Sequence, residues 1–213
     1  MKLIHFGVVA GLAVVLTQTV MAIDLDCGPL KLQGGFGPFD YRSSSERRDH
    51  LPIVERFHFD REIQAVDNRK RSLGSIGDNL SYTLIAFPNH YPALQSLMNL
   101  SDRVKEPKMS TMRYPFECYF ERAVRFVPDD PQSHMFYAMF LQKKDRTDEA
   151  LSQLLEAEKA TPEDANVQYN LGLMYLRKKD YERATEYAKK AYEQKFPLSG
   201  LRDKLKQAGH PLP

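Results

Sequence analysis

Apolar residues from position 78 onward recur at the three-to-four-residue spacing of amphipathic helices. Leu80 and Leu84 begin one such stripe, which Asp78 can cap at its N-terminal end. Further stripes predict helices over residues 90–104 and 116–127. No segment alternates polar and apolar residues as a half-buried strand does. The pattern therefore predicts an all-α fold.

The segment before position 78 is rich in residues that interrupt helices. Residues 27–41 contain four glycines and two prolines with aromatic side chains between them. Glycine permits positive φ and proline lacks a backbone N–H, so we expect an irregular loop that packs through its aromatic rings. Residues 42–49 are predicted to be a charged bridge and residues 74–77 another loop. Short helices are expected within 51–66, with Asp60 as an N-cap.

The C-terminal half of the chain repeats with a period of 34 residues. The matching pairs are Pro128 and Pro162, Tyr137 and Leu171, Ala138 and Gly172, Leu141 and Tyr175, Ala150 and Ala184, and Ala157 and Ala191. The small residues allow two helices to approach closely, and the large ones fill the space between them. The spacing predicts helix–turn–helix units over residues 131–164 and 165–197.

This pattern resembles the tetratricopeptide repeat family, whose helix–turn–helix unit has the same length. The residues that carry the resemblance are Leu171, Gly172, Tyr175, Tyr181, Ala184 and Ala191, with Pro162 before them and Pro197 after them. The preceding unit departs from the family where Ala138 replaces the usual glycine, and residues 119–128 resemble the second helix of a degraded earlier unit.

The resemblance implies an α-solenoid of two to three repeats, which needs a cap at each end to cover its apolar faces. Residues 78–130 would supply N-terminal capping helices and the degraded first repeat. Residues 198–213 would form the C-terminal capping helix, since Leu201 and Leu205 lie on one face. The irregular segment 23–77 would precede the array.

The resemblance also implies a binding surface. In this family, the first helix of each unit lines a concave groove that holds an extended peptide or a partner helix. By position, the residues placed there are Gln132, Met135, Met139, Gln142, Lys143, Asn166, Tyr169, Leu173, Leu176 and Arg177. Methionine suits adaptable binding surfaces, and Lys143 and Arg177 would select for charge. Alternatively, the capping helices or the Gly/Pro-rich loop already cover this apolar stripe.

The first 22 residues have the features of a cleaved signal peptide. Lys2 precedes an apolar run over residues 6–16, and Val20-Met21-Ala22 has the small-residue pattern of a cleavage site. This run is shorter than the roughly 20 residues needed to span a bilayer, and no later run is longer. The sequence therefore predicts an exported protein, most simply periplasmic, with no membrane insertion after cleavage.

Charge and cysteine content agree with export to a cell envelope. The net charge of +2 is too small for a dedicated nucleic-acid binder. The only cysteines, Cys27 and Cys118, are expected to form a disulfide, because that is the usual state of a cysteine pair in an exported chain. A lipoprotein would need small residues before Cys27 rather than Asp24-Leu25-Asp26, and a redox pair more often has the Cys-x-x-Cys spacing.

The sequence lacks the common motifs of enzymatic chemistry. The sequence contains no Gly-x-Ser-x-Gly elbow, no His-Glu-x-x-His pair and no phosphate-binding loop, and its histidines lack metal-ligand spacing. We therefore predict no catalytic residues, no metal site and no cofactor, and an adaptor that binds a protein or peptide in the cell envelope. The alternative is a small-ligand or catalytic site in the N-terminal segment that uses Asp40, Tyr41, Arg42 and His58.

Overall fold

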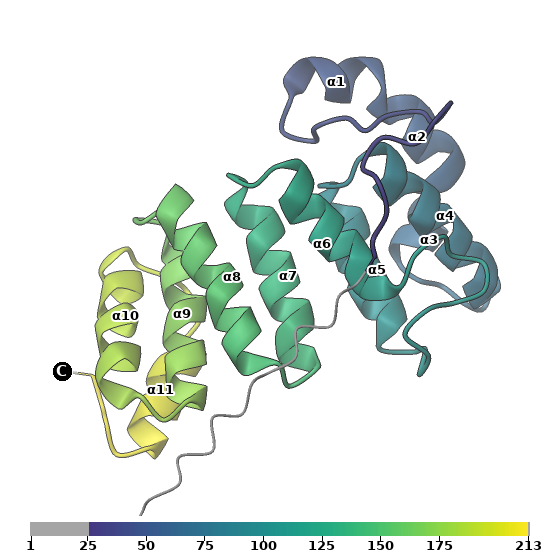
Figure 1. Cartoon of the computed structure of the whole chain (residues 1–213). Coiled ribbons are helices and arrows are strands. Elements are labelled where there is room, and N and C mark those ends of the chain that lie inside the picture. Colours follow the sequence, from purple (N-terminus) through teal and green to yellow (C-terminus); the bar gives the residue numbers. More distant parts are fainter. Residues whose placement is uncertain (1–25, 213) are drawn as a thin grey trace, which may run out of the picture.

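The computed structural model describes residues 26–212, and this part of the chain is helical with no strand (Figure 1). The predicted all-α class is confirmed. The helices are α1 (Ser44–Asp49), α2 (Leu51–His58), α3 (Arg61–Gln64), α4 (Leu73–Ala86), α5 (Tyr91–Ser101), α6 (Phe116–Phe126), α7 (Pro131–Lys143), α8 (Thr147–Ala160), α9 (Ala165–Arg177), α10 (Tyr181–Glu193) and α11 (Gly200–Gln207). The predicted signal peptide lies outside the described residues.

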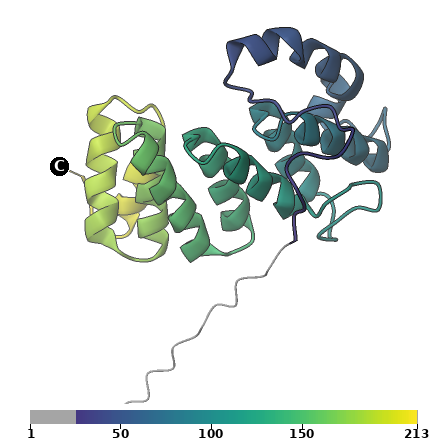
Figure 2. The ribbon, with the colours of Figure 1, turned by 45° about the horizontal axis from the view of Figure 1, so that its top comes forward.

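The C-terminal half is a stack of helical hairpins. Helices α7 and α8 form one hairpin, α9 and α10 form the next, and the two lie side by side in chain order (Figures 1 and 2). Helix α11 packs on α9 and α10 through Leu201 and Leu205, which are fully buried. A Cβ at Gly172 would meet the end of the Leu201 side chain, so glycine there lets α11 pack closely on α9.

The 34-residue period also appears in the hydrogen bonds. His134 Nε2 donates to the carbonyl of Pro128, and Gln168 Nε2 donates to the carbonyl of Pro162. The N-caps of α7 and α9 are Asp130 and Asp164, again one period apart. Equivalent polar side chains therefore attach the first helix of each hairpin to the end of the preceding helix. In this respect the two hairpins are structurally equivalent.

Two local predictions in the N-terminal part are wrong. Residues 74–77 are not a loop, because α4 begins at Leu73, where Ser72 Oγ accepts from the N–H of Ser75. Helix burial outweighs the low helix propensity of glycine here, since Gly77 makes room for the methionines of the loop between α5 and α6. Part of the predicted charged bridge is helical as well, since α1 starts after its N-cap Ser43.

The Gly/Pro-rich loop packs on the end of α4 through its aromatic side chains. The N–H of Phe39 donates to the carbonyl of Ala86 at 2.8 Å, and the Phe39 ring stacks on His50 with ring centroids 4.0 Å apart. Gly37 has φ +98°, and a Cβ there would lie 2.5 Å from the Ala86 carbonyl oxygen. The loop is therefore packed against the helices, as its aromatic content predicted.

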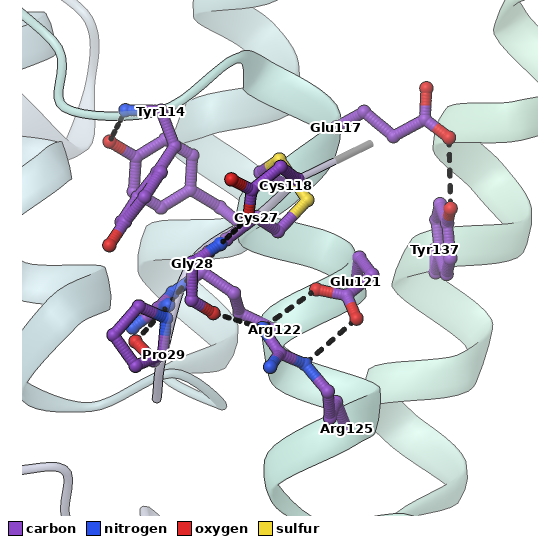
Figure 3. Close-up of a disulfide and its surroundings, with 12 residues drawn as sticks. Cys27, Gly28, Pro29, Tyr114, Glu117, Cys118, Glu121, Arg122, Arg125 and Tyr137 are labelled. Carbon is purple, nitrogen blue, oxygen red and sulfur yellow. Dashed lines mark hydrogen bonds and ion pairs between the residues drawn. A yellow bond between two sulfur atoms is a disulfide. The ribbon is translucent and has the colours of Figure 1, made fainter. Parts of the chain in front are cut away.

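A disulfide joins Cys27 to Cys118 on α6, as predicted (Figure 3). Beside it, the fully buried guanidinium of Arg122 donates to the backbone carbonyls of Cys27, Pro29 and Leu30. It also lies over the ring of Tyr114, 4.7 Å from the centroid. Burial lowers the pKa of Arg122 from its ordinary value. Covalent and polar contacts thus hold the start of the described chain against α6.

Candidate partner-binding face

The residues that the resemblance places in a groove all lie on α7 and α9, the first helices of the two hairpins. On α7 these are Gln132, Met135, Met139, Gln142 and Lys143, and on α9 they are Asn166, Tyr169, Leu173, Leu176 and Arg177. Within each helix, those spaced three or four residues apart share a helix face, and Lys143 and Arg177 lie beside it at the C-terminal ends. Their exposure and their partners separate them into three groups.

The first group is open to solvent. Met139 is 37% exposed, although the helix around it is largely buried, and Leu173 and Leu176 are half-buried at the surface of the hairpin core. Polar amides accompany these apolar side chains. We use the name α7–α9 face for the set Gln132, Met139, Gln142, Asn166, Leu173 and Leu176. Such a set can contact apolar side chains and hydrogen-bond to a peptide backbone.

The second group is covered by the protein itself. Tyr169 is 8% exposed, and its ring packs on Phe196 with centroids 4.5 Å apart. A side chain at Gly200 would lie 2.9 Å from its hydroxyl oxygen, and burial raises the pKa of Tyr169. Met135 is buried in the same core. Tyr169 is therefore an attachment point for the segment that leads into α11, not an exposed anchor, and here the alternative of self-coverage is correct.

The third group is charged and paired within the chain. Lys143 forms an ion pair with Asp102 at the end of α5, and Arg177 pairs with Asp145 at 2.5 Å. Each cation thus bonds to a carboxylate that precedes its own hairpin in the chain. Exposed pairs of this kind contribute about 0–1 kcal/mol each. The charges of Lys143 and Arg177, predicted to select the partner, are therefore each paired within the chain.

The alternative N-terminal site is only partly assembled. Arg42 donates to Asp40 and, at 3.1 Å, to Asp129 in the turn before α7. Asn89 donates to Asp40 at 2.7 Å and accepts from the N–H of Tyr41. Burial alone would raise the pKa of Asp40, but hydrogen bonds from Arg42 and Asn89 outweigh burial and lower the pKa. These contacts join the loop to the repeat array.

His58 does not belong to that cluster. Its ring stacks on Tyr82 with centroids 3.8 Å apart, and its Nδ1 bonds to Asn79. Among the described residues, no hydrogen bond, ion pair or ring contact connects it to Asp40, Tyr41 or Arg42. The four residues therefore do not form one constellation, because α2 carries His58 to a separate surface.

Sequence reasoning missed a polar cluster between α6, α7 and α8. Arg146 Nη1 bonds to both carboxylate oxygens of Glu117 at 2.6 Å, and the Tyr137 hydroxyl donates to the same carboxylate at 2.9 Å. Burial, together with Glu117, raises the pKa of Tyr137. These residues are too far apart in sequence to suggest contact. The cluster fastens α6 to the first complete hairpin.

Over residues 26–212, no group of three or more His, Cys, Asp or Glu side chains is placed to hold a metal ion. Within the same range, every helix is too short or too polar to cross a membrane.

Comparison with known proteins accounts for the hairpins. Residues 138–199 match the tetratricopeptide repeat family, from the middle of α7 to the start of α11. This part of the chain is a tetratricopeptide repeat array. No curated protein matches the chain.

Solved structures share the tetratricopeptide repeat fold. PilF of Pseudomonas aeruginosa is 21% identical with a TM-score of 0.53, over 74% of this chain and 70% of that one. MamA is 16% identical with a TM-score of 0.52, over 74% of this chain and 79% of that one. YrrB, described as a TPR protein with an unusual peptide-binding site, is 25% identical with a TM-score of 0.47, over 68% and 71%. PilF and MamA show that the fold extends upstream of the matched repeats.

Proposed function

We propose that the protein is a non-catalytic adaptor whose α7–α9 face binds a protein or peptide partner. The supporting observation is that Met139, Leu173 and Leu176 remain accessible on α7 and α9, the first helices of two tetratricopeptide repeats. Repeats of this family serve as protein-interaction scaffolds. The hairpin core is already filled by other residues. Because the helices are preformed, little ordering of the binding surface would oppose association.

The ion pairs of Lys143 and Arg177 indicate which kind of partner segment the α7–α9 face would prefer. Lys143 and Arg177 are engaged by Asp102 and Asp145, so the α7–α9 face offers mainly apolar and amide contacts. We expect it to favour an uncharged extended segment or the apolar side of a helix over an acidic tail. Binding should therefore depend weakly on salt.

We further propose that the protein acts in the cell envelope. The residues ahead of the described part have the pattern of a cleavable signal, and Cys27 and Cys118 form a buried disulfide, which is typical of exported proteins. The periplasm is the simplest location. Fractionation of the host, with detection of residue 23 as the mature N-terminus, tests this part separately.

A site-specific crosslink tests the binding face. Met139 is replaced by p-benzoylphenylalanine and the host cells are irradiated, with the same photoreactive residue at exposed Lys159 on α8 as the position control. We expect one discrete adduct from position 139 and none of that mass from position 159. Leu173→Glu in the same chain should remove the adduct, because it places a charge on the proposed contact.

Leu198→Glu provides the matched substitution, since Leu198 is an exposed apolar residue outside α7 and α9. It should leave the adduct unchanged. An adduct that persists with Leu173→Glu, or no adduct at position 139, would contradict binding at the α7–α9 face.

A further inference from the structure

An apolar pocket of about 210 Å³ lies beside α2. Its lining residues are Phe36, Ile53, Val54, Phe57, His58 and Tyr82. Both ribbon views place α2 at the end of the molecule opposite α10, away from the hairpins that carry the α7–α9 face (Figures 1 and 2). The pocket is therefore separate from the α7–α9 face.

The rim of the pocket exposes more apolar surface than folding requires. Phe57 is 61% exposed, Ile53 is 53% exposed and Tyr82 is 41% exposed. Val54, the neighbour of Ile53 on α2, supplies the core contact of that helix and is buried. Scattered exposed apolar residues are ordinary, but a group gathered around one pocket is typical of an interaction site.

The size of the pocket indicates what enters it. Sites for small molecules and cofactors usually have about 300–1,000 Å³. A pocket of about 210 Å³ instead suits a single large side chain. Protein interfaces often bury a large anchor side chain in a well-packed pocket, and aromatic residues and arginine are enriched among the residues that dominate binding.

One positive charge lies beside the rim residue Phe57. The Arg56 guanidinium lies over the ring of Phe57, 5.5 Å from its centroid, and forms no ion pair with any described residue. On the pocket wall, His58 donates from Nδ1 to Asn79 at 3.0 Å, which fixes its ring against Tyr82. A carboxylate next to the inserted side chain would therefore meet Arg56.

We propose that this α2 pocket is a second docking site, which takes an aromatic or branched apolar side chain flanked by a carboxylate on a partner protein. The apolar side chain fills the space between Phe57 and Tyr82, and the carboxylate pairs with Arg56. The proposal is independent of the α7–α9 face and of its partner.

Capped pentapeptides test this chemistry with the purified protein. Ser-Glu-Phe-Glu-Ser is titrated against Ser-Lys-Phe-Lys-Ser and Ser-Glu-Gly-Glu-Ser, and binding is followed by amide chemical shifts in NMR spectra at low salt. We expect saturable shifts at α2 and Tyr82 with the acidic phenylalanine peptide. Binding should be about fivefold weaker with the lysine peptide and lost with the glycine peptide.

Substitutions at exposed positions complete the test without disturbing the core. Arg56→Glu should reverse the preference between the two phenylalanine peptides, Phe57→Ser should abolish binding of both, and Met139→Ser should change neither. Equal affinity for the acidic and lysine peptides, shifts that saturate elsewhere, or no saturable shift up to the peptides' solubility limit would each overturn the proposal.

Discussion

Gly37 shows how a single residue can decide the path of the N-terminal loop. Its φ of +98° lies in the region that favours glycine, and its Cα faces the backbone of Ala86 with no room for a side chain. Gly34 also has positive φ, at +69°, but nothing lies within 4 Å of a Cβ built there. The two positions separate backbone strain from steric collision.

We expect Gly37→Ala to lower the free energy of unfolding by roughly 2–4 kcal/mol, because it adds a collision with a carbonyl to the strain of positive φ. Gly34→Ala should lower it by only about 1 kcal/mol, since strain alone applies. Urea denaturation monitored by circular dichroism measures both. Equal losses would mean that the loop shifts away from Ala86 at little cost.

At the scale of elements, the repeat explains why each hairpin needs its neighbours. A hairpin buries one face in its own core and leaves the other to the next unit. After α10 the described chain continues as the single helix α11, which together with the segment before it covers Tyr169 and Gly172. This is the reason that part of the predicted binding stripe is occupied.

Leu201 should therefore contribute much of the attachment of α11. We expect Leu201→Ala to lower the free energy of unfolding by about 2–4 kcal/mol, because it removes a fully buried side chain and leaves a cavity against α9. Lys204→Ala on the exposed side of the same helix is the control and should change it by less than about 0.5 kcal/mol. Chemical denaturation of both variants decides; a similar effect of the two would show that α11 is not held through its apolar side.

At the scale of the whole molecule, two contacts tie the N-terminal segment to the array. One is the Cys27–Cys118 disulfide, and the other is the cluster in which Arg42 bridges Asp40 and Asp129. The loop, α4 and the turn before α7 meet at this cluster. The loop over residues 27–41 is therefore attached both to α6 and to the turn before α7.

Replacing both cysteines with alanine should destabilise the protein by up to about 4–5 kcal/mol, because the bond closes a loop with a sequence separation of 91 residues. Denaturant unfolding of wild type with and without reductant should show a loss of the same order. The double variant should not respond to reductant, which separates the bond from side effects of the reagent. A wild-type protein insensitive to full reduction would contradict this prediction.

Acid should weaken the Asp40 cluster. The pKa of Asp40 is lower in the folded protein than its ordinary value of 3.8, so ionised Asp40 stabilises the fold above pH 3.8, and this contribution disappears as the pH falls through the folded pKa. Asp40→Asn should therefore be less stable than wild type near pH 7 and approach it in acid. The thermal unfolding midpoints of both proteins, measured from pH 7 to below pH 3.8, give the difference in stability at each pH. A difference that stays constant with pH would show that ionisation of Asp40 does not contribute to stability.

The sequence by itself determined the helical class, the 34-residue units, the disulfide and the presence of a packed aromatic loop. These features depend on local spacing or on residue chemistry that does not change with context. It failed at residues 74–77, because burial of α4 overrode the weak helix propensity of Gly74 and Gly77.

Only the tertiary structure decided which groove residues are accessible. Of the residues that the spacing placed in the groove, Met139 lies at the surface, whereas Tyr169 lies under the segment leading into α11. Likewise, the carboxylates that pair with Lys143 and Arg177 come from segments that precede each hairpin in the chain. Exposure and charge pairing depend on what packs against a helix, and that information is distributed over residues far apart in the chain.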